Sequence, residues 1–300
     1  MGLKSNKRGV AVVFDWIFSI VAGVLVFSFL IYFAVQHTDL FGKVTARVVA
    51  EELDVLFSGY ETAQVKAILD FGRRTELEFD CDNGVQHFKI NGRDGKTFWD
   101  KIVFSPDLVE GEKIDVATFS WNVPFRAANF IYLWDRRYEF EDAPINFDFF
   151  EPQKIKNKVE KVKFSKPVNS NFNCDFAEKD TKTIYYDIKE GEYQGYVCFN
   201  GKDDTPVKFF GEAMMMGAIV TDKDNFICAK ELINKKLEIM KRVFENKKNN
   251  LVTSNKFCNE DYSIIVGRIP TKVDQLDNYV FGFLKDKNTE LIIKGCASVY

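Results

Sequence analysis

The longest apolar segment of the chain lies near its start and predicts a membrane-spanning helix. From Trp16 to Val35, 20 consecutive positions carry no charged residue. A helix rises about 1.5 Å per residue, so this segment is long enough to cross the roughly 30 Å hydrocarbon layer of a bilayer. A surface helix of a globular domain would show a polar face within that length. We therefore predict a transmembrane helix over residues 10–36, in contact with membrane lipid.

Basic residues before this segment predict its orientation. The tail, residues 1–9, contains Lys4, Lys7 and Arg8. Positive residues beside a span stay preferentially on the cytoplasmic side. Lys43 and Arg47, which follow the span, reduce the bias. The prediction is a single-pass protein of the cell membrane, with a cytoplasmic N-terminus and an extracytoplasmic C-terminal region.

The start of the chain also resembles a known signal. Lys7, Arg8 and Gly9 directly precede the apolar segment, and Asp15 lies near its beginning. This arrangement resembles the class III signal of archaeal type IV pilin-like proteins. The resemblance implies cleavage beside the basic leader, and it implies that the helix is kept as a membrane anchor or filament core.

Asp15 has two interpretations. In the first, the lipid-spanning part begins at Trp16, and Asp15 lies at the headgroup level, where a carboxylate should cost less than the roughly 2.5–3.5 kcal/mol of the bilayer centre. In the second, which the pilin resemblance implies, Asp15 pairs with the free amino terminus of a neighbouring processed subunit. A cut after Gly9 would place Phe14 at the fifth mature position, where pilins usually carry glutamate, and Asp15 one place later.

The apolar spacing behind the span predicts a second helix and then a change to strands. Leu40, Val44, Val48, Leu53 and Leu56 roughly recur at helical spacing, which predicts a juxtamembrane helix over residues 37–59. From Thr75 the period changes to two, and Asn83-Gly84 and Asn91-Gly92 favour tight turns. We expect an antiparallel meander over Thr75–Phe104 and a β-rich domain over residues 60–145.

A second β-rich domain is predicted over residues 153–300. Strand-like segments include "KVEKVKFS", "KTIYYDIK", "GEYQGYVCFN" and "TPVKFFGEAMMMGAIVT". One amphipathic helix near 225–246 follows, with Asp224 as its cap, and the chain closes with the predicted strands "YSIIVGRI", "NYVFGFLK" and "TELIIKGCASV". The predicted fold class is α+β: an N-terminal transmembrane helix and a mainly antiparallel β-rich region with one amphipathic helix.

Composition supports a folded extracytoplasmic region. The chain is 46% hydrophobic and contains 30 Phe, and its net charge of −3 argues against a nucleic-acid surface. Two apolar clusters are expected in the core, although a protein interface would also suit them. They are the methionines Met214, Met215 and Met216 and the aromatics Trp121, Phe125, Phe130, Tyr132 and Trp134.

The six cysteines are far apart and form no C-x-x-C pair, so a zinc site is not expected. In an oxidising compartment they permit up to three disulfides. Cys228 with Cys258 is the first pairing we predict, and Cys174 with Cys198 is the second. The alternative is six buried free thiols, because cysteine is often a small core residue.

The sequence contains no motif for catalysis or for a cofactor, and no catalytic, cofactor-binding or metal residue is predicted. Cys81 and His87 could meet across a hairpin as a thiol–imidazole pair, but their spacing arises easily by chance. Two aspartate pairs could bind a hard cation, although exposed turns are the ordinary explanation. They are Asp80 with Asp82 and Asp203 with Asp204.

These observations favour a non-enzymatic, membrane-anchored protein with a structural or protein-interaction role at the cell surface, in the form of a pilin-like subunit that associates with itself or with a protein partner. The alternative is an extracytoplasmic ligand-binding or sensory domain. An envelope-bound hydrolase is the third hypothesis, and it would depend on Cys81 or His87.

Overall fold

The protein divides into two compact units, residues 1–49 and residues 50–300. The structure is a computed structural model, and the ranges it describes are 21–32, 50–51, 53–55, 57–59, 65–82, 84–98, 100–145, 147, 150, 158–166, 174, 177–178, 181–189, 191–201, 204–254 and 256–300.

The structure describes only part of the two N-terminal helices that the sequence predicts. Of the predicted span, residues 21–32 are helical, and residues 10–20 and 33–36 lie outside the described residues. Among the residues that are described, no helix is long and apolar enough to cross a membrane. Of the predicted juxtamembrane helix, residues 50–51, 53–55 and 57–59 are helical, whereas residues 37–49 are not described.

The first sheet of the larger unit has the strand order β3-β2-β1-β5-β6-β4. Its strands are β1 (Lys66–Asp82), β2 (Val85–Ile90), β3 (Arg93–Phe98), β4 (Ile102–Phe104), β5 (Leu108–Asn122) and β6 (Arg126–Trp134). The antiparallel β1-β2-β3 meander is confirmed, with Asn91 and Gly92 at φ 52° and 70° in its second turn. β4 is not part of that meander, because it pairs with β6 in parallel.

The second sheet has the order β11-β10-β9-β8-β7. Its strands are β7 (Arg137–Glu141), β8 (Val159–Ser165), β9 (Lys182–Lys189), β10 (Glu192–Cys198) and β11 (Val207–Phe210). β7–β8 and β8–β9 are parallel, as is β4–β6, so both sheets are mixed. The other six described pairings are antiparallel, in agreement with the expected mainly antiparallel region. Long connections precede β8 and β9, and parallel pairing needs such connections. The compact unit 50–300 includes both regions predicted as domains, 60–145 and 153–300.

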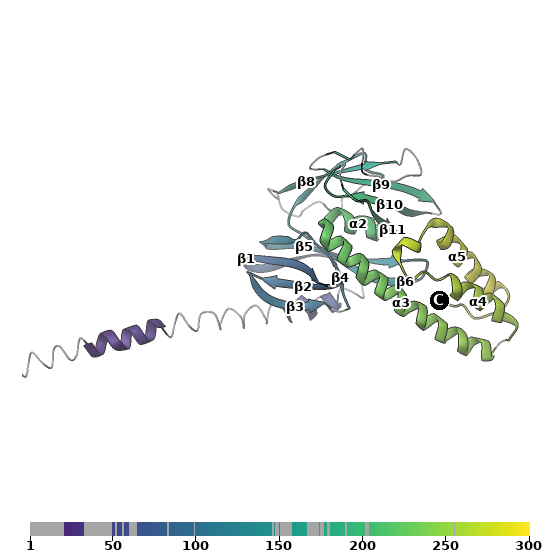
Figure 1. Ribbon diagram of the computed structural model, residues 1–300, viewed down its shortest axis with the longest axis horizontal. Helices are drawn as coiled ribbons and strands as arrows, with labels where there is room; N and C mark the ends of the chain where they lie inside the picture. Colours follow the sequence, from purple (N-terminus) through teal and green to yellow (C-terminus); the bar gives the residue numbers. More distant parts are fainter. Residues whose placement is uncertain are drawn as a thin grey trace, which may run out of the picture. The chain divides into compact units, whose positions relative to one another are not determined.

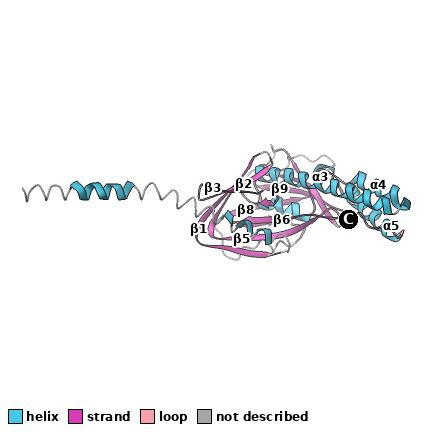
Figure 2. Ribbon diagram, turned by 90° about the horizontal axis from the view of Figure 1, so that it is seen from below, coloured by secondary structure: helices cyan, strands magenta, loops and turns pink. Residues whose placement is uncertain are grey.

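Four described α-helices follow the sheets, where the sequence predicted one. They are α2 (Glu212–Val220), α3 (Lys223–Ser254), α4 (Asn259–Arg268) and α5 (Asn278–Ile293), with short 3-10 turns η2 (Lys256–Cys258) and η3 (Val273–Gln275). Figure 1 shows α2 between the two sheets and α3 running from the first sheet to α4 and α5. Figure 2, coloured by secondary structure, shows α3 running along the strands toward α4 and α5.

The predicted closing strands are wrong, because their apolar residues follow the helical period. α4 buries Tyr262, Ile265 and Val266. In α5 the carboxylate of Asp277 caps the helix by accepting a hydrogen bond from the backbone N–H of Val280 at 2.7 Å. α2 was also expected as a strand. Its residues are buried on nearly every side, so it shows no apolar stripe that would distinguish a helix.

The α3 helix is longer than the predicted 225–246 and begins before the predicted cap. The backbone N–H of Phe226 donates to the carbonyl of Asp222, so Asp224 lies within the first turn. Most of the predicted apolar stripe faces the core, including Ala229, Ile233 and Leu237, but Val243 is exposed.

The core between the sheets contains the predicted methionine and aromatic clusters, and their burial is confirmed. Two of these aromatics form buried hydrogen bonds to the second half of the chain. Trp121 donates to the backbone carbonyl of Phe210, and Tyr132 donates to the backbone carbonyl of Ala213, both at 2.8 Å. Gly217 allows α2 to approach closely, because a Cβ there would lie 2.7 Å from the ring of Phe104.

Three disulfides use all six cysteines: Cys81–Cys228, Cys174–Cys198 and Cys258–Cys296. The predicted pair Cys174–Cys198 is confirmed. The predicted pair Cys228–Cys258 is wrong, because Cys228 lies near the beginning of α3 and Cys258 beyond its end. A helix rises about 1.5 Å per residue, so this separation is roughly 40 Å, far beyond the reach of a disulfide.

Candidate functional site

An open acidic cleft lies where the first sheet meets the beginning of α3. Its cavity volume is about 1080 Å³. β1, β2, the residues at the start of β5 and the first turns of α3 contribute its walls. The charged residues of the lining are six acids and one base: Glu76, Glu78, Asp80, Asp107, Asp224, Glu231 and Lys89.

The acidic wall of β1 follows from strand alternation. In the segment "TELEFDCD", the even positions Glu76, Glu78 and Asp80 point away from the core, whereas Leu77 and Phe79 are buried. Lys89 on β2 partly balances this row, since it lies directly across from Glu78 with its ammonium 3.9 Å from the carboxylate. β1 therefore contributes a row of carboxylates to the lining of the cleft.

The opposite wall is held to the sheet by covalent and polar contacts. The Cys81–Cys228 disulfide joins the end of β1 to α3. The side-chain amide of Asn225 donates to the Asp107 carboxylate at 3.1 Å and to the backbone carbonyl of Phe79 at 3.4 Å. Lys235 donates to the backbone carbonyl of Gly84 at 3.0 Å. These contacts fix the distance between the two acidic walls.

Negative charge is concentrated enough in the cleft to perturb Asp107. Burial raises the pKa of the Asp107 carboxyl, and the carboxylates of Asp222, Asp224 and Asp80 raise that pKa further, against the opposing effect of Arg136. A raised carboxyl pKa means that the native state holds the proton more tightly than the unfolded state does. Asp107 therefore reduces the stability of the fold as the pH rises through its unfolded-state pKa of about 3.9.

We expect Asp107→Asn to raise the unfolding midpoint at pH 7 by about 2 °C, because it removes the repulsion and keeps an oxygen that can accept from Asn225. The gain should shrink as the pH falls toward about 3, below the unfolded-state pKa of about 3.9, where Asp107 becomes protonated in both states. Thermal unfolding between about pH 3 and pH 8 measures this. Asp94→Asn on the exposed side of β3 is the control, and an equal gain in both variants would contradict the prediction.

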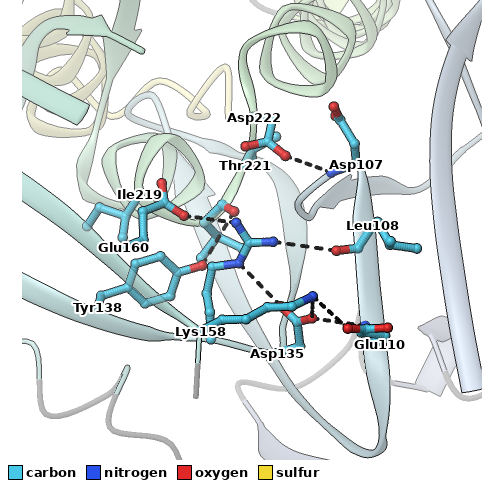
Figure 3. Close-up of polar contacts among 12 residues, drawn as sticks. Asp107, Leu108, Glu110, Asp135, Tyr138, Lys158, Glu160, Ile219, Thr221 and Asp222 are labelled. Carbon is cyan, nitrogen blue, oxygen red and sulfur yellow. Dashed lines mark hydrogen bonds and ion pairs between the residues drawn. The ribbon is translucent and has the colours of Figure 1, made fainter. Parts of the chain in front are cut away.

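Behind the cleft, a group of charged side chains joins the two sheets (Figure 3). Arg136 lies between β6 and β7; its Nε is 3.2 Å from Asp135 Oδ1, and its Nη1 is 3.1 Å from Glu160 Oε2. Lys158 Nζ lies 3.1 Å from both Asp135 Oδ2 and Glu110 Oε1. We call this group the charged staple, because it links β5 of the first sheet to β8 of the second.

Lys182 extends the charged staple to α2. Its side chain is 4% exposed, and its Nζ lies 2.6 Å from Glu160 Oε1. The same ammonium donates to the backbone carbonyls of Ile219 at 2.7 Å and Thr221 at 2.9 Å. A cation is favourable at the C-terminal end of a helix, where carbonyls lack partners. Each cation of the charged staple pairs with a carboxylate of the same group. We therefore interpret its role as structural.

The predicted candidate residues do not form a reactive site. Cys81 is in a disulfide and lies opposite Gln86 in the strand register, so it is not a thiol partner for His87. His87 Nδ1 instead forms a 2.8 Å hydrogen bond with the hydroxyl of Thr97. In the part of the chain that is described, no group of three or more His, Cys, Asp and Glu side chains is suited to hold a metal ion.

The predicted aspartate pairs have different surroundings. Asp80 lines the cleft, but Asp82 does not belong to its lining. The carboxylate of Asp204 is buried, accepts from the backbone N–H of Phe199 at 2.6 Å and pairs with Lys223, so it anchors a turn. Asp203 lies outside the described residues.

Sequence reasoning missed the cleft as a whole. The alternation of acids in β1 was a local signal for one wall, but Asp107, Asp224 and Glu231 are far from it along the chain.

Comparisons of the chain with models of protein families, with curated proteins and with solved structures found no match. The cleft is therefore interpreted from its geometry and charge. Its carboxylates favour positively charged groups over anions. The two cysteines in its lining, Cys81 and Cys228, are joined in a disulfide, so neither offers a free thiol.

Proposed function

We propose that the protein is a membrane-anchored, extracytoplasmic protein with a non-enzymatic structural or protein-interaction role at the cell surface, as a pilin-like subunit. The observation that carries the proposal is the use of all six cysteines in three disulfides within the larger unit. Disulfides form and persist in oxidising environments and are rare in the cytosol. The apolar segment over residues 10–36 and its basic leader support an N-terminal anchor.

The three disulfides are distributed over the larger unit, as is typical of a domain in an oxidising environment. Cys81–Cys228 links the first sheet to α3. Cys174–Cys198 joins a residue before β9 to the last residue of β10. Cys258–Cys296 joins the residue before α4 to the segment after α5. Each bridge therefore stabilises a different part of the unit, including its C-terminal end.

Intact mass and N-terminal sequencing of the protein from native membranes test the proposal. We expect a chain that begins at Val10, with alkylation of six cysteines only after reduction. Alkylation without reduction would contradict an oxidising exterior, and a chain that retains residues 1–9 would contradict pilin-type processing. Trypsin added to intact cells is the topology control, since it should digest the larger unit from outside.

The acidic cleft favours a second candidate, an extracytoplasmic domain that binds a cationic ligand. Such a domain would be a monomer whose unfolding midpoint rises with the ligand concentration, because a ligand that binds only the native state stabilises it. A structural subunit would instead associate with itself. The concentration dependence of its mass separates the two.

A further inference from the structure

The outer face of the second half of α3 carries exposed apolar residues with basic residues around them. Ile239 and Val243 lie one turn apart and are 58% and 56% exposed. Two basic residues flank this pair on the helix surface: Arg242 lies three positions after Ile239, and Lys247 lies four positions after Val243. We call these four residues the basic helix face. Among the described residues, no ion pair involves either of its two cations.

α3 contributes both to the lining of the acidic cleft and to the basic helix face. Asp224, Cys228 and Glu231, in the first turns of α3, line the cleft. Residues 235–248 then contain six basic and two acidic side chains. The 16 residues from Glu231 to Lys247 span about 24 Å at 1.5 Å per residue. Because α3 is one continuous helix, the basic helix face cannot fold back into the cleft of its own chain.

We propose that the acidic cleft of one molecule binds the basic helix face of a second copy of the same chain. The cleft is lined by six acids and one lysine, so its charge complements the two cations of the basic helix face. Ile239 and Val243 would supply the apolar centre of the contact, and the charges would form its rim. The proposal rests on the proposed self-associating function and names the surfaces that carry the association.

The contact is heterologous, because the two surfaces differ and each molecule carries one of each. Each added copy leaves one cleft and one basic helix face unoccupied at the ends. Such head-to-tail contacts produce a ring if the rotation closes and an open filament if it does not. The association should weaken with salt, because exposed charges are screened over about 8 Å at physiological ionic strength.

A charge-swap experiment tests the proposal on the full chain in nonionic detergent, with mass measured by sedimentation. The cleft-reversed variant is Glu78→Lys with Glu231→Lys, and the face-reversed variant is Arg242→Glu with Lys247→Glu. Each alone should associate at least about tenfold more weakly than the wild type, because both of its surfaces then carry the same sign. An equimolar mixture of the two variants should recover the association, because each reversed surface meets an opposite one.

Milder variants and matched controls guard against simple misfolding. Glu78→Gln with Glu231→Gln should weaken the association less than reversal does, with unfolding midpoints measured for every variant. Lys189→Glu, at the exposed end of β9, and Ile293→Ser, at an 80% exposed residue of α5, should leave the association unchanged.

Two results would overturn the proposal. One is association that neither reversed variant nor 0.5 M salt changes, which would place the contact elsewhere, such as in the N-terminal segment, and would leave the proposed function standing. The other is a wild-type chain that stays monomeric while spermine raises its unfolding midpoint, which would assign the cleft to a small cation. Loss of the proposed function would appear instead as free thiols in the intact protein.

Discussion

Replacing both Cys81 and Cys228 with alanine is expected to lower the free energy of unfolding by about 5 kcal/mol, more than the loss of either other disulfide. The bridge joins residues 147 positions apart, whereas Cys174–Cys198 and Cys258–Cys296 close separations of 24 and 38. In the chain-entropy model, the unfolded chain gains more freedom when a longer loop is released. The same model gives about 3.5 and 4 kcal/mol for the two shorter loops.

Urea unfolding of the paired alanine variants measures these differences, and Cys174→Ala with Cys198→Ala is the matched control. The Cys81–Cys228 variant should also weaken the head-to-tail association, since it frees α3 from the end of β1 at the cleft, and the control should not. An equal or smaller loss of stability in the Cys81–Cys228 variant than in the control would contradict the expected order.

The parts of the fold that the sequence predicted correctly depend on short-range signals. The β1-β2-β3 meander follows from alternating side chains and from Asn91-Gly92, which adopts positive φ angles at little steric cost. The burial of Met214 and Trp121 follows from their large apolar side chains. These features require no knowledge of which distant segments meet.

The parts that could not be predicted depend on distant contacts. α4 and α5 contain β-branched residues that favour strands locally and compete with the helical spacing of their apolar residues, and packing of that apolar face against the core decides for the helix. Cys81 meets Cys228 only because α3 lies across the end of β1, and six cysteines allow 15 pairings. The cleft has the same origin, because Glu78 and Glu231 share it only once the sheet and helix have packed together.

Lys182→Met is expected to cost about 3–5 kcal/mol, which lowers the unfolding midpoint by roughly 10 °C in a unit of this size. The ammonium of Lys182 is buried and contacts the Glu160 carboxylate and the carbonyls of Ile219 and Thr221. Methionine fills a similar volume but donates no hydrogen bond. Two carbonyls at the end of α2 then lose their donor, and Glu160 retains only Arg136 as its cationic partner among the described residues.

Lys189→Met is the matched control, because Lys189 lies on the same strand with a side chain that is 65% exposed and pairs only with nearby Asp187 in the described structure. Its loss should stay within about 1 kcal/mol, as for other surface ion pairs. The double variant Lys182→Met with Glu160→Gln should cost less than the sum of its two single changes, because removing both charges leaves neither one buried alone. Equal losses for Lys182→Met and Lys189→Met would show that the charged staple does not hold α2 between the sheets.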